Sequence, residues 1–390
     1  MQVVLSTIGK FHTFDLAREL HRRGMLSAIF SGYPRFKLRQ EQLPEALVRT
    51  FPWLRTPYMA LARRSGISAR FMRWVERLSY ATFDRYTASH LPKCDVFVGL
   101  SGSALHSGRQ ARQHGARYVC DRGSSHIRTQ HELIAQEHAL WGQREPDADP
   151  RTIAQEEAEY AEADCITVPS RFAADTFIAQ GVPAHKVRCL PYGVNLTDFH
   201  PVAQPQADGF DVLFAGGASL RKGVPYLLQA FQRLQHPRKR LLFAGSFPSE
   251  LAEHMRAAGL WSDSIELLGH LEWPALRERM GRSHALVLPS IEDGFGLVMA
   301  QAMACGCPVV ASEHTGARDL FTDGDAGFIV PIRRADLLAE RLQQLADDPA
   351  LRQTMGQRAL QAVQAVGGWQ RYGDEAVATY ASLLPQGATA

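Results

Sequence analysis

Short apolar runs alternate with longer amphipathic stretches along this chain. A run of roughly four to eight apolar residues is typical of a buried strand, and a stretch with a 3.6-residue repeat is typical of a helix packed on a sheet. The alternation predicts an α/β protein built from parallel sheets. The strands are expected at residues 3–6, 26–31, 95–99, 117–120, 165–168, 187–190, 211–215, 241–244, 265–268, 285–288, 309–311 and 328–330.

Start and stop signals frame the amphipathic stretches. Ser170 can cap a helix start, and Gly24, Gly181 and Gly306 each follow the end of a helical stretch. These signals support a helix after most of the predicted strands. The helices are expected at about 14–23, 128–141, 153–163, 171–180, 226–234, 297–304, 335–345, 350–365 and 369–384.

The series of strands is interrupted once, in the middle of the chain. Residues 201–209 contain two prolines and little apolar content, as expected of a linker. A length of 390 residues suits two domains that each bury a core. The sequence therefore predicts two doubly wound domains facing each other across a cleft, 1–204 and 205–366, followed by a last helical segment, 367–390.

Composition narrows the class of protein. Hydrophobic content of 45% and charged content of 21% are those of a soluble globular protein. The six cysteines form no C-x-x-C pair, so reduced thiols are expected. The first residues lack the basic and apolar regions of a secretory signal, and no apolar run approaches the roughly 20 residues of a membrane span. We expect a cytoplasmic protein.

Positive charge is concentrated in one segment of the first domain, residues 35–86. Between Arg35 and Arg85 there are eleven Lys or Arg and four Asp or Glu, interleaved with eight aromatic residues. Such a segment suits peripheral contact with an anionic membrane. A solvated helical insertion with an ordinary core face is the alternative. No nucleic-acid-binding module accompanies the charge, so nucleic acid is not an expected partner.

The candidate chemistry is densest at 285–312, where a strand, a glycine loop, a helix and a second strand follow one another. Gly294 and Gly296 allow a tight turn and close approach to a ligand. The helix after them directs free amides at that ligand, which favours a phosphate site. Asp293 and Gln301 stand about two helical turns apart and could reach one bound molecule.

A second glycine loop follows the strand 211–215. Gly216 and Gly217 precede Arg221 and Lys222, and these two cations could neutralise a diphosphate at the same edge of the sheet. Taken alone, the loop is equally compatible with a solvated turn.

Two further candidates lie in the first domain. Gly9 follows the first strand, where a ligand would meet the backbone, although a plain turn is the alternative. His126 follows the strand 117–120 in a loop of small polar residues, and a histidine that only braces this loop is its rival reading. The G-x-G-x-x-G dinucleotide fingerprint is absent, which disfavours a nicotinamide oxidoreductase.

These motifs together resemble the donor domain of retaining glycosyltransferases of family four, which have the GT-B fold. The family signature is Glu-Gly-Phe-Gly followed by Glu-Ala-Met-Ala-x-Gly-x-Pro-Val-Val; this chain has Asp-Gly-Phe-Gly at 293–296 and Gln-Ala-Met-Ala-Cys-Gly-Cys-Pro-Val-Val at 301–310. The turn 190–195 and the segment 315–319 resemble two further family motifs. The likeness is good over about 155–385 and only in outline before that. It implies that the last helix returns to the first domain.

The resemblance implies catalytic roles for four residues. Arg221 and Lys222 would hold the donor diphosphate and stabilise the leaving group without a metal. Asp293 would contact sugar hydroxyls, and His126 resembles the family histidine near the transferred sugar. Neither a cofactor nor a metal is expected. The residues implied to bind the donor are Gly9, Gly216, Gly217, Gly294, Phe295, Gly296, Leu297, Val298 and Gln301.

Two positions depart from the family pattern. Asp293 is one methylene shorter than the family glutamate, though Glu292 adjoins it. Gln301 is neutral, so it can hydrogen-bond hydroxyls but cannot act as an acid or base. The Asp-x-Asp pairs at 147–149 and 323–325 are interpreted as turns, not metal sites.

The expected activity is transfer of a sugar from a nucleotide-sugar to a hydroxyl acceptor with retention. The acceptor is expected to be a glycan or lipid-linked, as in cell-surface polysaccharide assembly at the inner face of the membrane. Three alternatives stay open: epimerisation or phosphorolysis of a nucleotide-sugar, non-catalytic binding of a nucleotide-sugar as a partner protein, and, more distantly, hydride transfer.

Overall fold

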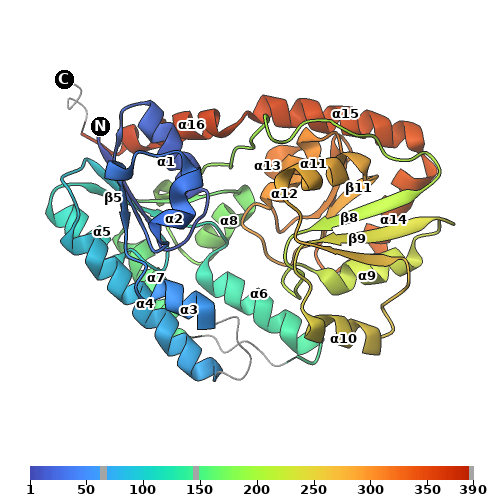
Figure 1. Cartoon of the computed structure of the whole chain (residues 1–390), viewed down its shortest axis with the longest axis horizontal. Helices are drawn as coiled ribbons and strands as arrows, with labels where there is room; N and C mark the ends of the chain where they lie inside the picture. The colour runs from blue at the N-terminus through green and yellow to red at the C-terminus, as the bar shows by residue number, and fades with distance from the viewer. Residues whose placement is uncertain (62–67, 144–148, 386–390) are drawn as a thin grey trace.

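The computed structural model describes residues 1–61, 68–143 and 149–385 as two α/β lobes side by side, each with one parallel sheet (Figure 1). The N-terminal sheet has seven strands in the order β3-β2-β1-β4-β5-β6-β7. Its strands are β1 (Val3–Thr7), β2 (Leu26–Ser31), β3 (Val48–Thr50), β4 (Val96–Leu100), β5 (Arg117–Asp121), β6 (Cys165–Val168) and β7 (Val187–Cys189).

The C-terminal sheet has six strands in the order β10-β9-β8-β11-β12-β13. Both sheets reverse their direction of winding beside the first strand, β1 or β8, and a crevice forms at such a switch point. The strands are β8 (Phe210–Ala215), β9 (Lys239–Ala244), β10 (Ile265–Gly269), β11 (Ala285–Leu288), β12 (Val309–Ser312) and β13 (Gly327–Val330). The predicted α/β architecture of two doubly wound parallel sheets is confirmed.

Helices cover both faces of each sheet (Figure 1). Those of the N-terminal lobe are α1 (Thr13–Arg22), α2 (Arg35–Leu38), α3 (Arg55–Leu61), α4 (Ala69–Ser89), α5 (Leu105–Gln113), α6 (Ile127–Leu140), α7 (Pro150–Glu162) and α8 (Arg171–Ala179). Those of the C-terminal lobe are α9 (Val224–Arg233), α10 (Ser249–Ala257), α11 (Trp273–Arg282), α12 (Leu297–Ala304), α13 (Ala317–Leu320), α14 (Ala335–Asp347) and α15 (Pro349–Val366). Short 3₁₀ turns occupy Arg39–Glu41, Glu45–Leu47 and Ala184–Lys186.

The last helix, α16 (Trp369–Ser382), packs against α1 of the N-terminal lobe. Gly373 lies so close to α1 that an added Cβ would come within 2.6 Å of the Glu19 Cβ, and the Arg23 guanidinium bonds the Gln370 carbonyl at 3.0 Å. The helices α15 and α16 run along one edge of both lobes in Figure 1. This crossing ties the two lobes together.

The basic segment 35–86 is not purely helical. Within it, β3 pairs in parallel with β2 as an edge strand of the sheet. The prediction of a helical segment missed this strand because β3 is only three residues long. The long helix α4 packs through Val75, Ser79 and Phe83, which are buried at four-residue spacing. Residues 62–67 lie outside the described part of the chain.

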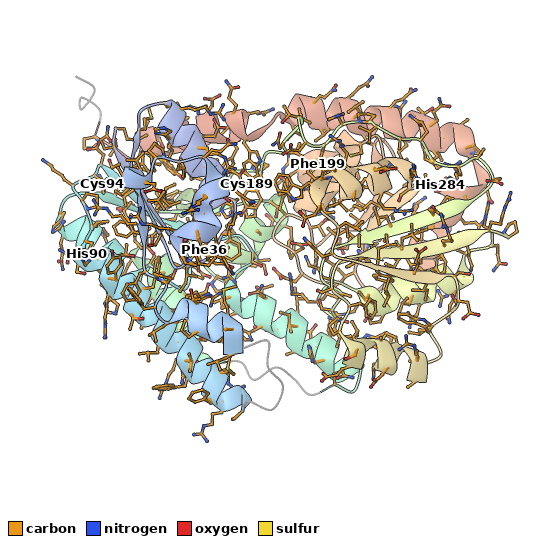
Figure 2. The ribbon with its side chains drawn as sticks, in the orientation of Figure 1. Phe36, His90, Cys94, Cys189, Phe199 and His284 are labelled. Atoms are coloured by element: carbon orange, nitrogen blue, oxygen red, sulfur yellow. The ribbon has the colours of Figure 1, made fainter. Side chains whose placement is uncertain are left out.

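Burial explains which apolar runs became central strands. Every residue of β1, β8, β11 and β12 is buried, as the continuous apolar runs predict. Edge strand β10 is the exception, since it is mostly exposed and Leu267 is 45% exposed. Side chains fill both lobes in Figure 2, where Phe199, buried near the linker, is labelled.

Candidate active site

A cavity of about 510 Å³ lies between the two lobes, at the carboxyl ends of their central strands. Both lobes contribute to its walls, as expected for a ligand site at a topological switch point. From the N-terminal lobe it is lined by Phe11, His12, Asp15, Leu100, Ser101, Arg122, Gly123, Ser124 and Tyr192, with Trp369 from α16; from the C-terminal lobe by Ala215, Gly216, Lys222, Leu288, Asp293, Phe295, Gly296, Leu297 and Val298.

The start of α12 forms the C-terminal wall of the cavity. Gly296 precedes the helix with φ +78°, a left-handed conformation that favours glycine, and an added Cβ would lie 2.4 Å from Leu288. Leu297 and Val298 then line the cavity as the first residues of the helix. The amides at a helix start have no partner within the helix, and together with the helix dipole they favour an anion at this wall.

Lys222 and Asp293 form an ion pair on the same wall. Both side chains are less than one-fifth exposed and both line the cavity. The pair keeps a cation next to the start of α12, and the ammonium can exchange the carboxylate for a phosphate oxygen.

Arg221 is held differently from its neighbour. Its guanidinium donates to the backbone carbonyl of Glu292 at 2.8 Å and to the Glu292 carboxylate at 3.2 Å. It is about one-third exposed and does not line the cavity. The structure thus places Lys222 in the cavity and Arg221 beside it, bonded to Glu292. From the sequence, Glu292 was noted only as the neighbour of Asp293.

Glu292 is fully buried and joins the two lobes. Its Oε1 accepts from the Ser124 hydroxyl at 2.6 Å and from the Ser125 amide at 3.0 Å, and its Oε2 accepts from Gln130 at 3.0 Å. Burial raises the pKa of Glu292, but the Arg221 charge and these hydrogen bonds outweigh burial and lower the pKa to about 2. The carboxylate is therefore ionised at neutral pH.

The loops on either side of the cavity touch at a glycine. A Cβ added to Gly294 would lie 2.0 Å from the Gly123 carbonyl oxygen of the opposite lobe. Gly294 therefore serves the contact between lobes.

His12 occupies the N-terminal wall, and its role was not identified from the sequence. Its Nε2 lies 2.6 Å from an Asp121 carboxylate oxygen, and its ring stacks on Tyr192 with 4.3 Å between centroids. Thr167 donates to the other Asp121 oxygen at 2.9 Å. No local motif marks this cluster. Asp121 is 109 residues from His12 in the sequence and Tyr192 is 180 residues from it, so only folding brings them together.

His126 is placed away from the cavity. It caps α6, where its Nδ1 accepts from the Arg128 amide at 3.2 Å, and its ring packs against Tyr160 and Phe177. Burial lowers its pKa to about 4. These surroundings suit the alternative hypothesis for His126, a histidine that only braces this loop.

Several other expected donor contacts also lie outside the cavity lining. Gly9 is buried beneath the ring of Phe11, which an added Cβ would meet at 2.2 Å. Gly217 sits beside Ser246, and Gln301 is half-buried one turn further along α12. Of the expected residues, the cavity is lined by Gly216, Lys222, Asp293, Phe295, Gly296, Leu297 and Val298.

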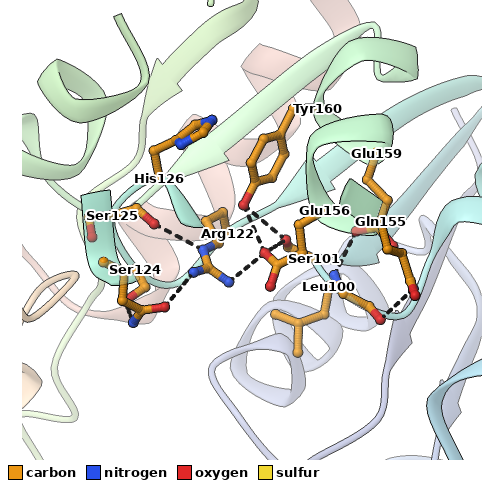
Figure 3. A network of polar contacts seen from close by, with 12 residues as sticks. Leu100, Ser101, Arg122, Ser124, Ser125, His126, Gln155, Glu156, Glu159 and Tyr160 are labelled. Carbon is orange, nitrogen blue, oxygen red and sulfur yellow. Dashed lines mark hydrogen bonds and ion pairs between the residues drawn. The ribbon is translucent and has the colours of Figure 1, made fainter. Parts of the chain in front are cut away.

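A second cavity of about 340 Å³ adjoins the first within the N-terminal lobe. Ser101 and Arg122 line both cavities, so they form a shared wall. Figure 3 shows Arg122 between the Ser125 carbonyl, at 3.1 Å, and Glu156, at 2.6 Å. Other residues around this cavity include Arg73, Glu76, Arg77, Tyr80, His131, Asp149 and Gln155.

The second Asp-x-Asp pair lies in a turn, whereas Asp149 of the first pair begins a helix. Asp323 accepts from the Ile329 amide at 2.8 Å, Asp325 pairs with Arg358 at 2.9 Å, and Asp149 caps α7. Asp147 lies outside the described residues. Within residues 1–61, 68–143 and 149–385, no three His, Cys, Asp or Glu side chains group as metal ligands would. No helix in the same residues is long and apolar enough to cross a membrane.

Comparison with known proteins places this geometry in a family. The family model for glycosyltransferase family 4 matches residues 10–198, and that for glycosyl transferases group 1 matches residues 197–362. A D-inositol 3-phosphate glycosyltransferase of Catenulispora acidiphila is 29% identical over 296 residues, 70% of each chain. One from an Arthrobacter species is 32% identical over 213 residues, half of each chain.

Solved structures agree in fold over nearly the whole chain. A sucrose-phosphate synthase from Thermosynechococcus elongatus has a TM-score of 0.74 at 24% identity, covering 98% of this chain and 99% of its own. Anabaena Alr3699/HepE, solved in complex with UDP, has a TM-score of 0.71 at 16% identity, covering 98% and 100%. With two parallel-sheet lobes, a cleft-facing helix start and both family models in sequence, the chain belongs to the group 1 glycosyltransferases of family 4.

Proposed function

We propose that this glycosyltransferase moves a sugar from a nucleotide-sugar to a hydroxyl acceptor with retention of anomeric configuration. The observation that carries the proposal is that Lys222, Asp293 and the start of α12 line one cavity between the lobes. A cation and a helix N-terminus suit a diphosphate, and a carboxylate suits sugar hydroxyls. Structures of the fold neighbour from Anabaena that hold UDP and UDP-glucose support a donor of this class.

The reaction needs charge stabilisation more than a protein nucleophile. The bond from the anomeric carbon to the diphosphate oxygen breaks, and the diphosphate leaves with the electron pair. The acceptor oxygen bonds that carbon on the same face and gives its proton to the departing phosphate. Lys222 and the α12 amides stabilise the charge that develops on the diphosphate, and no metal or cofactor is required in this scheme.

The acceptor is proposed to enter from the second cavity. Its ionised residues are largely paired, Arg77 with Asp149 at 2.8 Å and Arg122 with Glu156, so it suits a polyhydroxylated molecule. D-inositol 3-phosphate, after which two of the relatives are named, is one such molecule. A glycan or a lipid-linked sugar is another, and would place the enzyme in cell-surface glycan assembly.

Product analysis tests this function. The purified chain is incubated with a panel of nucleotide-sugars and acceptors, and released nucleoside diphosphate and product are measured, with the anomeric configuration read by NMR. Release coupled to a glycosylated product of retained configuration is expected. An inverted product contradicts the mechanism. An epimerised nucleotide-sugar would favour epimerisation, and binding without turnover would favour a non-catalytic partner protein.

We propose further that α4 rests on an anionic membrane surface. Its outward face carries Phe71, Trp74 and Leu78, which are 48%, 52% and 37% exposed, and Arg70 and Arg85 are exposed on the same helix. Phe36, labelled in Figure 2, is 64% exposed in the same basic segment. Exposed aromatic residues among arginines suit the boundary between headgroups and acyl chains.

Co-sedimentation with vesicles tests the membrane proposal. The protein should bind phosphatidylglycerol vesicles at low salt and not phosphatidylcholine vesicles. Replacing Phe71→Ser together with Trp74→Ser should lower binding at least tenfold, whereas Trp273→Ser, which changes a 56% exposed residue of the other lobe, should not. Equal binding by all three proteins contradicts the assignment to α4.

A further inference from the structure

The Glu292 carboxylate accepts most of its hydrogen bonds from across the interface between the lobes. Glu292 is 0% exposed, although the next residue, Asp293, lines the cavity. Three donors from the N-terminal lobe reach its Oε1: the hydroxyls of Ser124 and Ser125, at 2.6 and 2.9 Å, and the Ser125 amide, at 3.0 Å. A buried carboxylate must be paired to be tolerated, and here every pairing group except one belongs to the opposite lobe.

The exception is Arg221 of the C-terminal lobe. The Arg221 guanidinium is fixed by both the carboxylate and the backbone carbonyl of Glu292, and the Arg221 carbonyl accepts from the Ile291 amide at 2.9 Å. Arg221 therefore cannot turn toward or away from the cavity independently of Glu292. The orientation of this arginine depends on a residue whose remaining partners lie in the other lobe.

We propose that Glu292 is a positioning residue that sets the Arg221 guanidinium for the donor diphosphate only when the two lobes are closed. The inference rests on the proposed function for the identity of the ligand. Closure brings the donors of Ser124, Ser125 and Gln130 onto Glu292, and Glu292 then orients Arg221. In an opened molecule these donors leave, and the carboxylate can bond Arg221 more directly and draw it away from the ligand.

The second cavity, proposed for the acceptor, is connected to Glu292 by hydrogen bonds. Gln130 donates to Glu292 through its amide nitrogen and accepts from the Arg122 guanidinium at 2.8 Å through its amide oxygen. Arg122 is shared by both cavities and bonds Glu156 in the second one. An acceptor seated in the second cavity therefore touches residues that are one hydrogen bond from Gln130 and two from Glu292.

The donors around residue 292 explain why a carboxylate, and not an amide, occupies this position. A glutamine in place of Glu292 would keep the shape, but its NH2 group would face either the Gln130 amide and the Arg221 guanidinium or, in the flipped orientation, the Ser125 amide, donor against donor. Loss of the orientation of Arg221 by a misplacement near 1 Å can reduce rate on the order of 10²-fold.

A double-mutant cycle tests the positioning role. Glu292→Gln, Arg221→Gln and the double variant are compared in kcat and KM for the donor. Glu292→Gln should lower kcat/KM at least tenfold, mainly through kcat, and the double variant should match Arg221→Gln within twofold because Glu292 acts through Arg221. Losses that multiply, or a Glu292→Gln variant within twofold of wild type, overturn the proposal. Glu272→Gln, at an 87% exposed carboxylate, is the control.

Gln130→Met keeps the test decisive if Glu292→Gln fails to fold. Gln130 does not line the first cavity and is connected to Arg221 through Glu292, so a purely structural residue here would change thermal stability without changing kcat. We expect kcat to fall at least threefold and donor hydrolysis to rise relative to transfer, since looser closure admits water. An unchanged kcat and an unchanged ratio of hydrolysis to transfer contradict the proposal.

Small-angle scattering separates this inference from the proposed function. In the absence of ligand, Glu292→Gln should have a larger radius of gyration than wild type, because the lobes lose their shared carboxylate. If wild type neither binds UDP nor consumes any nucleotide-sugar, the proposed function fails while the scattering comparison still tests the closure. Equal radii together with unchanged kinetics reject the role of Glu292.

Discussion

The two walls of the cavity are built in different ways. The C-terminal wall is largely backbone: Gly216, Gly296 and the first turn of α12 present amides and a helix end, with Lys222 and Asp293 added. Each glycine belongs to a short local loop, Gly216 beside Gly217 and Gly296 beside Gly294, so each loop can be recognised in the sequence.

The N-terminal wall is made of side chains held by other side chains. His12 is fixed by Asp121 and Tyr192, and Arg122 by Glu156 and Gln130. Each partner comes from a different strand end or helix, so the wall has no local signature. The comparison teaches that sites built from backbone amides can be predicted from a sequence. Networks of side chains can be identified only in the folded structure.

Removing the cation of the C-terminal wall should have the largest effect. Lys222→Ala is expected to lower kcat/KM by about 10²–10³-fold, comparable to the loss of one preorganised charge-stabilising donor. Steady-state kinetics with a saturating acceptor measure this loss. Lys93→Ala, at an exposed lysine far along the N-terminal lobe, should leave kcat/KM unchanged. Near-normal turnover in Lys222→Ala would remove Lys222 from the donor site.

Replacing His12 and His126, two histidines of the N-terminal lobe, should sharpen the comparison. His12→Ala should lower kcat/KM by about 10²-fold with a small change in thermal stability, because His12 lines the cavity. His126→Ala should do the reverse and destabilise by about 1–2 kcal/mol through loss of the cap, with kcat within a few fold of wild type. Kinetics and thermal unfolding of both variants measure the difference.

The opposite pattern, a fully stable His126→Ala variant without activity, would return His126 to the catalytic role first expected from the sequence.

Forcing the walls apart should have an intermediate effect. A Cβ at Gly294 would lie 2.0 Å from the Gly123 carbonyl oxygen, so Gly294→Ala should cost about 1–3 kcal/mol in the closed form and lower kcat about tenfold. Gly209→Ala is the matched control, since its nearest atom would be 3.7 Å away. If both glycine variants keep wild-type kcat, the contact between loops is not needed for turnover.

The smallest expected effect is a dependence of stability on pH. The folded pKa of His126 is about 4, below the ordinary value near 6.5, so the unfolded chain binds the proton more readily between these values. Stability should therefore fall by about 1–2 kcal/mol as pH drops from 7 to 5. Denaturant unfolding at both pH values tests this, and His126→Asn, which retains a capping side chain, should reduce the drop.

Sequence patterns were enough to locate nearly all of the strands in both sheets. Continuous apolar runs mark strands buried on both faces, and among the described residues the only strand missed, β3, has three residues at a sheet edge. The glycine loop and the start of α12 were also predictable, because Gly296 must take a left-handed conformation for the helix to begin there.

For His126 the sequence left two hypotheses, a catalytic residue and a histidine that braces the loop, and it passed over His12. Both are single histidines in loops after strands, and no local feature separates a cavity residue from a helix cap. The difference lies in which partner each meets: Asp121 for His12, 109 residues away, and Tyr160 with Phe177 for His126.

The sequence by itself determined the two doubly wound sheets and the glycine loops of the second domain, because periodic burial and glycine turns are local requirements. Only the tertiary structure decided that Lys222 faces the cavity while Arg221 is held by Glu292, and that Glu292 is shared by both lobes. Glu292 and Ser124 are 168 residues apart, and a contact at that separation is set by how the lobes close rather than by any neighbouring residue.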